Sequence, residues 1–148
     1  MNDVVLLDAG PLGMISHPRA SAEVVAWLAR LVAAGVEVLV PEISDYEVRR
    51  ELLRAGSLRG VERLDELKQR LGFVPITSAA MLQAAAFWAD ARRRGQPTAS
   101  DDSLDADVIL AAQAATLRET AKDVVVASTN PRHISRFVPA EHWQDVTG

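Results

Sequence analysis

Acidic residues stand beside apolar segments at three separate places in the chain. Asp8 directly follows the apolar run at residues 4–7, where a charge is costly unless it is solvated, paired or bound to a cation. Glu47 lies soon after the largely apolar segment at 36–40, and Asp105 and Asp107 precede the apolar stretch that starts at Val108. Converging carboxylates without cysteine favour a hard ion such as Mg²⁺ or Mn²⁺. Such an ion suits phosphodiester hydrolysis, because it positions water and neutralises developing charge.

Each of these acids also has an ordinary structural explanation. Asp8 precedes Ala-Gly-Pro, as a turn aspartate that bonds to its own backbone does. Glu47 fits a solvated helix charge, although one face of its helix is apolar enough to turn inward. Asp105 and Asp107 fit the first turn of a helix, where acids cap free N–H groups. Because residues two apart do not share a helix face, these two hold one ion only if Asp105 precedes the helix.

Alternating apolar patterns predict the elements that carry these residues. Strands are expected at residues 4–7, 36–40, 73–76 and 124–127. Helices are expected at 21–34, 43–54, 57–71, 77–94 and 105–118, with a loop at 95–103. Strands that alternate with helices predict an α/β protein with a parallel sheet and helices on both faces.

The first and the last predicted strands along the chain are both followed by polar residues at their carboxyl ends. Asp8 closes the first strand, and Ser128, Thr129 and Asn130 follow the last. In open parallel sheets the chemistry lies beyond the carboxyl ends of the strands. We therefore expect these two segments to be neighbours at one edge of the sheet.

Bulk composition narrows the class of protein. The chain has 148 residues, which predicts a single domain over residues 1–148, and its lack of cysteine excludes disulfides and thiolate metal sites. The net charge of −4 makes it a poor general binder of polyanions, so nucleic acid needs a local basic patch. The residues 1–10 do not resemble a signal peptide, and no run reaches the ~18 apolar residues of a membrane span. A cytoplasmic protein is expected.

Basic residues near the proposed acids are the candidates for contacts with phosphate. Arg49 and Arg50 belong to the predicted Glu47 helix, and Arg132 and Arg136 follow Asn130. The arginines at 92–94 end a helix, where cations are favourable for helix stability alone.

The order of these motifs resembles the PIN domain. The matching features are Asp8 after an apolar strand, Glu47 in a mid-chain helix, the helix Asp107-x-x-Leu-Ala-Ala-Gln-Ala, and a strand followed by Ser-Thr-Asn130. They span about residues 3–138. The resemblance implies a three-layer α/β/α sandwich and a Mg²⁺- or Mn²⁺-dependent ribonuclease. It also implies that Asp8, Glu47 and Asp107 hold the metal, with Asp105 as an auxiliary acid.

The segment after the last central strand departs from the family pattern. Ser128 and Asn130 fit the threonine and asparagine of the family, but His133 stands where many members have a further acid. The resemblance implies that Asn130 coordinates or orients a water, and that Ser128 and His133 lie on the substrate side. The loss of the acid argues against a second metal more than against the first.

Small members of this family suggest partners as well as an activity. Many resemble the VapC toxins of toxin–antitoxin pairs, which implies RNA as substrate, a small antitoxin as inhibitor and a homodimer. The alternative is a PIN-like module that binds RNA or protein with weak or no nuclease activity. A haloacid-dehalogenase-type phosphotransferase needs a second aspartate where Gly10 stands, and a receiver domain needs an acidic pair that residues 1–11 lack.

Overall fold

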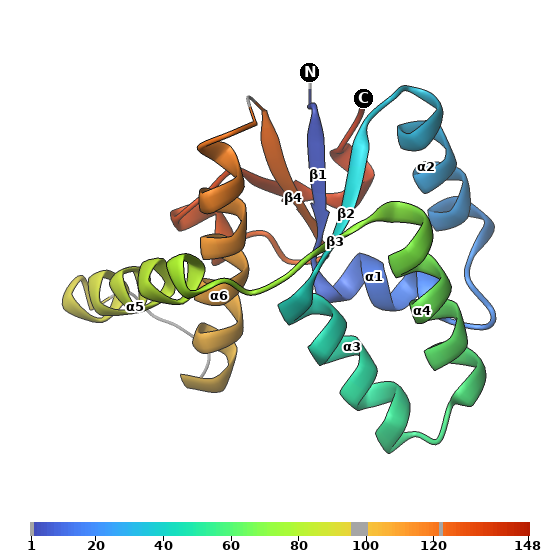
Figure 1. Ribbon diagram of the computed structural model, residues 1–148, viewed down its shortest axis with the longest axis horizontal. Helices are drawn as coiled ribbons and strands as arrows, with labels where there is room; N and C mark the ends of the chain where they lie inside the picture. The colour runs from blue at the N-terminus through green and yellow to red at the C-terminus, as the bar shows by residue number, and fades with distance from the viewer. Residues whose placement is uncertain (1, 96–100, 122) are drawn as a thin grey trace.

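A five-stranded parallel sheet forms the centre of the molecule (Figure 1). The computed structural model describes residues 2–95, 101–121 and 123–148. The strands lie in the order β3-β2-β1-β4-β5. Their bounds are β1 (Val4–Leu7), β2 (Glu37–Pro41), β3 (Phe73–Val74), β4 (Val124–Ser128) and β5 (Ala140–His142). The neighbouring pairs are all parallel, so every strand ends at the same edge of the sheet.

The two central strands are buried on both faces. Every residue of β1 and β4 is buried, and the register pairs Leu7 with Ala127. Continuous Val and Leu runs of this kind are required where helices cover both faces of a parallel sheet. The polar residues that directly follow, Asp8 and Thr129, therefore emerge together at the carboxyl edge.

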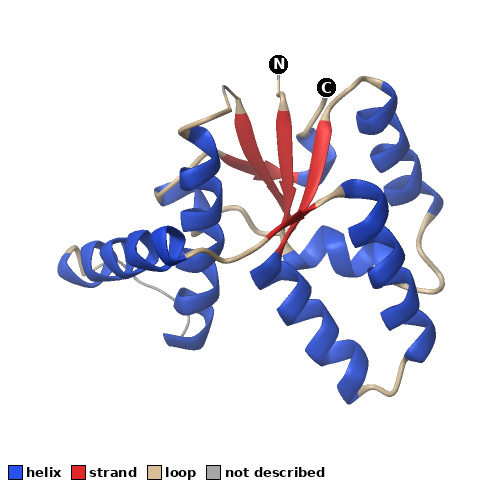
Figure 2. Cartoon of the chain, in the orientation of Figure 1, coloured by secondary structure: helices blue, strands red, loops and turns tan. Residues whose placement is uncertain are grey.

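Helices cover the two faces unequally (Figure 2). The helices α1 (Ala9–Ser16), α2 (Ala22–Ala33) and α4 (Leu58–Leu71) contribute to the hydrophobic core on one face, together with part of α3 (Glu42–Arg54). On the other face lies α6 (Asp101–Arg118), with α5 (Ser78–Arg93) packed against it. Two 3₁₀ turns, η1 (Ile134–Arg136) and η2 (Trp143–Asp145), complete the tail. The expected three-layer α/β/α sandwich is confirmed.

The predicted elements are recovered, with two differences near the site and an additional strand, β5, in the tail. The expected strands and most helices match to within two residues, but the helix α1 begins where the sequence suggested only a turn at Asp8. Its Pro11 lies in the first turn, where the missing N–H has no partner to lose. The second difference is α6, which begins at Asp101 instead of 105, so Asp105 lies inside the helix. Residues 96–100 of the expected loop lie outside the described residues.

The described part of the chain contains no helix that is both long and apolar enough to span a membrane.

Candidate active site

Asp8 is fixed at the carboxyl edge of the sheet by two hydrogen bonds to its side chain. Its Oδ1 accepts from the backbone N–H of Ala9 at 2.7 Å, which makes Asp8 the N-cap of α1. Its Oδ2 accepts from the hydroxyl of Ser128 at 2.6 Å. Burial raises the pKa of Asp8, and these two hydrogen bonds oppose that rise. The carboxylate is thus held in one orientation at the point where β1 passes into α1.

Ser128 links the ends of β1 and β4. Its side chain is fully buried, and its Oγ also accepts the backbone N–H of Asn130 at 2.9 Å. The hydroxyl is not exposed in this structure, and the substrate-binding role expected for Ser128 stays a prediction. Its hydroxyl connects the carboxylate of Asp8 to the turn that carries Asn130, a residue that is exposed.

Gly10 allows this turn to approach α1 closely. A Cβ at Gly10 would lie 2.5 Å from the Oγ1 of Thr129, far inside van der Waals contact. No side chain larger than hydrogen fits there unless Thr129 moves. From the sequence alone Gly10 indicates a turn and excludes another family, but this packing role is not evident. The available signal was a glycine two residues beyond an acid at a strand end.

Glu47 and Asp107 approach Asp8 from opposite sides of the sheet edge. Glu47 lies on α3 and Asp107 on α6, and both are half-buried. Burial raises the pKa of Glu47 to about 7, with further repulsion from Asp8 and Asp107 and an opposing attraction from Arg50. Burial and the charge of Asp8 raise the pKa of Asp107 to about 6, and Arg136 opposes that rise. The structure therefore brings the three predicted carboxylates into one repulsive electrostatic environment.

A buried glutamine holds α3 and α6 in place beside each other. The Oε1 of Gln113 accepts the backbone N–H of Ile43 at 3.3 Å, and its Nε2 donates to the carbonyl of Val74 at 2.7 Å. Gln113 is fully buried, so these bonds satisfy a polar group that would otherwise be costly. It thereby sets the distance between the helices of Glu47 and Asp107. Its place in an otherwise apolar helix was the signal that the sequence offered.

The donor chemistry of the cluster fits a hard divalent cation. Its side-chain donors are carboxylate oxygens, the ligands that Mg²⁺ and Mn²⁺ prefer. Within residues 2–95, 101–121 and 123–148, no three histidine, cysteine or acidic side chains are placed as a complete metal-binding group. The fit is therefore one of chemistry and charge. Burial first, and then repulsion between the carboxylates, raises the pKa of Glu47 and Asp107, and a cation would relieve that repulsion.

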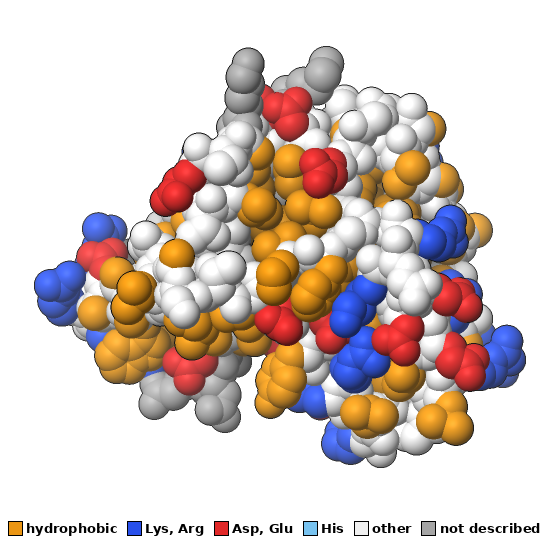
Figure 3. Space-filling model, in the orientation of Figure 1, with side chains coloured by type: hydrophobic (Ala, Val, Ile, Leu, Met, Phe, Trp, Pro, Cys, Tyr) orange, Lys and Arg blue, Asp and Glu red, His pale blue; other side chains and the backbone are white. Residues whose placement is uncertain are grey.

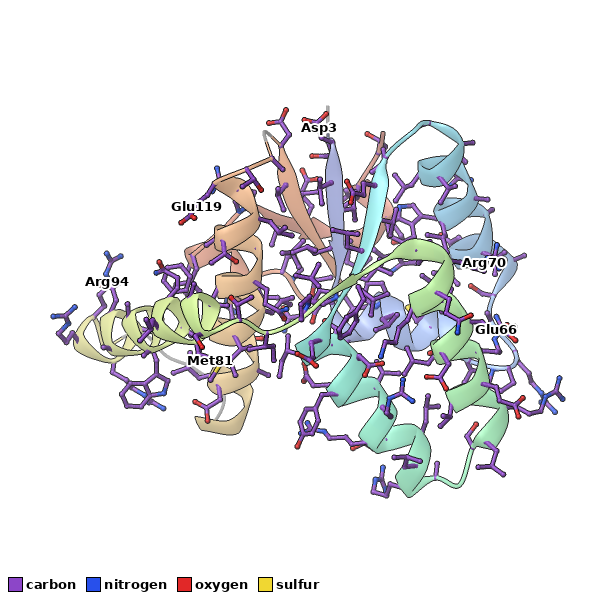
Figure 4. The ribbon with its side chains drawn as sticks, viewed as in Figure 1. Asp3, Glu66, Arg70, Met81, Arg94 and Glu119 are labelled. Atoms are coloured by element: carbon purple, nitrogen blue, oxygen red, sulfur yellow. The ribbon has the colours of Figure 1, made fainter. Side chains whose placement is uncertain are left out.

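Two predicted site residues point elsewhere. Asp105 is exposed and lines a hollow between α5 and α6 with Met81 and Trp88, away from Asp8. Figure 4 marks Met81 on α5, where this helix crosses α6. Arg49 pairs with Asp45 at 2.9 Å and Asp65 at 2.7 Å, which turns it towards α4. Asp105 thus lies on the α5 side of α6, and its role as an auxiliary acid stays a prediction. Arg49 is paired with acids of the protein itself.

The remaining basic candidates differ in their relation to the cluster. Arg50 is exposed and acts on Glu47, and Arg136 acts on Asp107. Arg132 is exposed in the turn after Asn130. His133 is half-buried, and its buried Nδ1 has no hydrogen-bond partner among the described residues. In Figure 3 acidic atoms lie near the head of a notch between the α6 side and the α3 side, with Lys and Arg atoms beside them over α3 and α4.

Solved structures share this fold over almost their whole length. The FitAcB structure from Neisseria gonorrhoeae is similar with 20% identity and a TM-score of 0.70, covering 96% of this chain and 99% of that one. The VapBC2 structure from Rickettsia felis, bound to a promoter DNA fragment, has 12% identity, a TM-score of 0.74 and coverage of 95% and 98%. VapBC-1 from nontypeable Haemophilus influenzae has 15% identity, a TM-score of 0.70 and coverage of 96% and 99%.

Sequence comparison supplies the family. No curated protein matches the chain. The family model of the PIN domain matches residues 5–137, a span that contains Asp8, Glu47, Asp107 and Asn130. The chain therefore belongs to the PIN domain family.

Proposed function

We propose that this protein is a metal-dependent endoribonuclease that hydrolyses RNA phosphodiester bonds and acts as the toxin of a toxin–antitoxin pair. The observation that carries the proposal is the convergence of Asp8, Glu47 and Asp107 from three different elements at one edge of the sheet. Membership of the PIN family supports the nuclease class. The structural likeness to VapBC complexes supports the toxin–antitoxin assignment.

In this proposal Asp8, Glu47 and Asp107 hold Mg²⁺ or Mn²⁺. When bound, the ion lowers the pKa of a coordinated water and neutralises charge on the phosphate. Asp8 enters the reaction already oriented by Ser128 and Ala9, so little reorganisation is needed there. Asn130 presents an exposed amide at the same edge, where its carbonyl oxygen orients the attacking water.

RNA cleavage by the wild type and by variants of Asp8, Asp107 and Asp105 tests this proposal. The protein is incubated with structured and single-stranded RNAs in Mg²⁺, Mn²⁺ or EDTA. Cleavage should require the ion and fall by more than about 100-fold in Asp8→Asn and Asp107→Asn, whose carboxylates are proposed to hold it. Asp105→Asn is the matched control, because Asp105 lies two residues away on α6 but lines the hollow beneath α5. It should retain cleavage.

Circular dichroism of each variant separates loss of chemistry from loss of folding. If folded wild-type protein binds RNA but cuts none of the substrates with either ion, the nuclease proposal fails and a PIN-like binding module replaces it. Equal losses in Asp105→Asn and Asp107→Asn would show that the placement of these acids is irrelevant to cleavage.

The proposed partner requires a separate experiment. Expression of the chain alone in bacteria should arrest growth, whereas Asp8→Asn should not. Co-expression of a small protein encoded directly upstream should restore growth and co-purify with the chain. We propose a homodimer for the toxin, which light scattering at known concentration measures. Growth arrest that persists in Asp8→Asn would contradict a toxicity based on cleavage.

A further inference from the structure

A fully buried side chain of α6 caps the helix that carries Glu47. The residue before α3 is Pro41, whose side chain makes no hydrogen bond to the free N–H groups of the first turn. The Oε1 of Gln113 accepts one of them, the N–H of Ile43, at 3.3 Å. Donor and acceptor are 70 positions apart in the chain. The start of α3 is therefore capped from α6 and not by a neighbour in the sequence.

The same glutamine also holds the segment between β3 and α5. Its Nε2 donates to the carbonyl of Val74 at 2.7 Å. Glu42, the first residue of α3, accepts the N–H of Ile76 at 2.7 Å through its Oε1. Figure 1 shows this segment passing from the α3 side of the molecule to the α6 side. We call Gln113 and Glu42 the brace, because their three hydrogen bonds join α3, α6 and the β3–α5 segment.

The Gln113 side of the brace lies in the hydrophobic core. Gln113 is 0% exposed and Ile43 is 7% exposed. Ile43, Val74 and Ile76 belong to or pack against one hydrophobic cluster, which also contains Leu110 of α6. Breaking a hydrogen bond there would leave a buried donor or acceptor unpaired, which is costly. The brace is thus a rigid connection between the elements that it joins.

Helix geometry places two of the proposed site acids close to the brace. Glu47 follows Ile43 by four positions, on the same face of α3 and ~6 Å further along its axis. On α6, Asp107 lies three positions before Leu110, which in turn lies three positions before Gln113. A rotation or shift of α3 at its start would therefore be carried to Glu47 and change its position relative to Asp107.

We propose that Gln113 and Glu42 are positioning residues, which hold α3 so that it presents Glu47 at the carboxyl edge in a constant position during RNA cleavage. This proposal rests on the proposed nuclease function. Gln113 acts through the backbone of α3, and Glu42 acts through the β3–α5 segment. Neither residue has to contact the RNA.

The arrangement of the helices can be measured without any cleavage. The chain has no cysteine, so Leu53→Cys on α3 and Arg118→Cys on α6, both at exposed positions, accept spin labels at defined sites. The distance distribution between the labels, measured by double electron–electron resonance, should be narrow with the brace intact and should broaden or shift in Gln113→Leu. An unchanged distribution in Gln113→Leu would overturn the proposal, whether or not the protein cleaves RNA.

RNA cleavage tests the positioning role itself. Gln113→Leu should lower kcat by at least about tenfold and change KM for RNA by less than about threefold, because Gln113 has no exposed surface. Glu42→Ala should lower kcat by roughly three- to tenfold, and Glu42→Gln, which keeps an acceptor for Ile76, should recover most of the rate. A wild-type kcat in folded Gln113→Leu, or a change in KM alone, would overturn the proposal. A wild type that cuts no RNA would defeat the proposed function, and the label distances would still decide whether the brace holds α3.

Trp27→Phe is the matched control for the loss of a long-range hydrogen bond. The Nε1 of Trp27 donates to the carbonyl of Val146 at 3.0 Å, in the core on the other face of the sheet. Its loss should lower the thermal midpoint and leave the label distances and the kcat of the folded protein unchanged. A loss of kcat in Trp27→Phe as large as that in Gln113→Leu would show a general effect of destabilisation, which overturns the positioning role.

Glu42→Ala carries the test if circular dichroism shows that Gln113→Leu does not fold. Glu42 is only half-buried, so its truncation is the milder change. A broadened distance distribution together with a lower kcat in Glu42→Ala would support the proposal. A wild-type value of either quantity in this variant would overturn it.

Discussion

The strand edge and the two flanking helices hold their carboxylates in different ways. Asp8 is fixed through both oxygens, by Ser128 at 2.6 Å and by the N–H of Ala9 at 2.7 Å. Glu47 and Asp107 are governed by burial and by charge, through repulsion from Asp8 and attraction from Arg50 and Arg136. Burial raises the pKa of all three carboxyl groups, but hydrogen bonds that fix the orientation are seen at Asp8.

This difference indicates that the three acids have different roles in the proposed metal site. A group that is oriented by hydrogen bonds supplies a reference point for the reacting atoms. Groups that repel one another remain apart until a cation favours their approach. We therefore expect the site to tolerate changes in the reach of the helix-borne acids better than changes at Asp8.

Exchanging the lengths of the acids gives the largest expected effect. Asp8→Glu moves the carboxylate beyond both of its hydrogen bonds and should lower kcat by about 100-fold or more. Glu47→Asp shortens an acid whose side chain makes no hydrogen bond among the described residues, and should lower kcat by only about tenfold. Single-turnover RNA cleavage measures both, with thermal unfolding as the control for folding. Equal losses would refute the distinction between a fixed and an adjustable carboxylate.

Removing the hydroxyl that orients Asp8 should have the next largest effect. Ser128→Ala leaves the carboxylate in place without its Oδ2 partner, so kcat should fall by roughly 10- to 100-fold with little change in KM. Ser128→Thr keeps the hydroxyl and should restore most of the rate. Ser135→Ala serves as control, because its Oγ bonds only the nearby carbonyl of Arg132 at 3.0 Å. A loss that Ser128→Thr does not recover would indicate a packing defect instead of an orienting role.

The sequence predicts which residues lie at the carboxyl edge of the sheet, because this depends only on the direction of each strand. An acid after a buried strand has to lie at the carboxyl edge, so Asp8 and the segment after β4 could be placed together from pattern alone. Glu47 and Asp107 could be proposed as site residues only through the resemblance to the family pattern. The three-layer arrangement could also be predicted, because strands that are apolar throughout have to be covered by helices on both faces of the sheet.

The remaining features depend on contacts between distant residues. The bond from Ser128 to Asp8 joins residues 120 positions apart, so sequence pattern assigned the serine to the substrate instead. The helix α1 was missed because Gly10 and Pro11 indicate a turn when their tertiary packing is unknown. The start of α6 was placed too late, because the helix begins several residues before its apolar stretch.

A side chain added at Gly10, where α1 meets the turn after β4, should destabilise the protein next to Asp8. The new Cβ of Gly10→Ala meets Thr129, which should lower the free energy of unfolding by about 1–3 kcal/mol. Gly13→Ala on the same helix places its Cβ 3.8 Å from Val48 and should be neutral or stabilising by up to about 1 kcal/mol. Urea unfolding measures both. Thr129→Ala should recover part of the loss in the double variant, and independent effects would contradict a direct clash.

The smallest expected effect is the pH dependence of stability that Glu47 and Asp107 cause. The folded-state pKa of Glu47 is raised from 4.5 to about 7, and that of Asp107 from 3.8 to about 6. Between these values the folded chain binds more protons than the unfolded chain, so stability falls as pH rises. In EDTA the thermal midpoint should therefore decrease by a few degrees from pH 5 to pH 7.5.

Two additions isolate this contribution from the rest of the protein. Glu47→Gln removes one titrating group, so its thermal midpoint should fall less over the same pH range and exceed that of the wild type at pH 7.5. Mn²⁺ should raise the wild-type midpoint at pH 7.5 more than at pH 5, because the deprotonated carboxylates are the ones that bind it. If Glu47→Gln keeps the full slope, the repulsion that makes the helix-borne acids adjustable is not exerted through Glu47, and the contrast with Asp8 loses its physical basis.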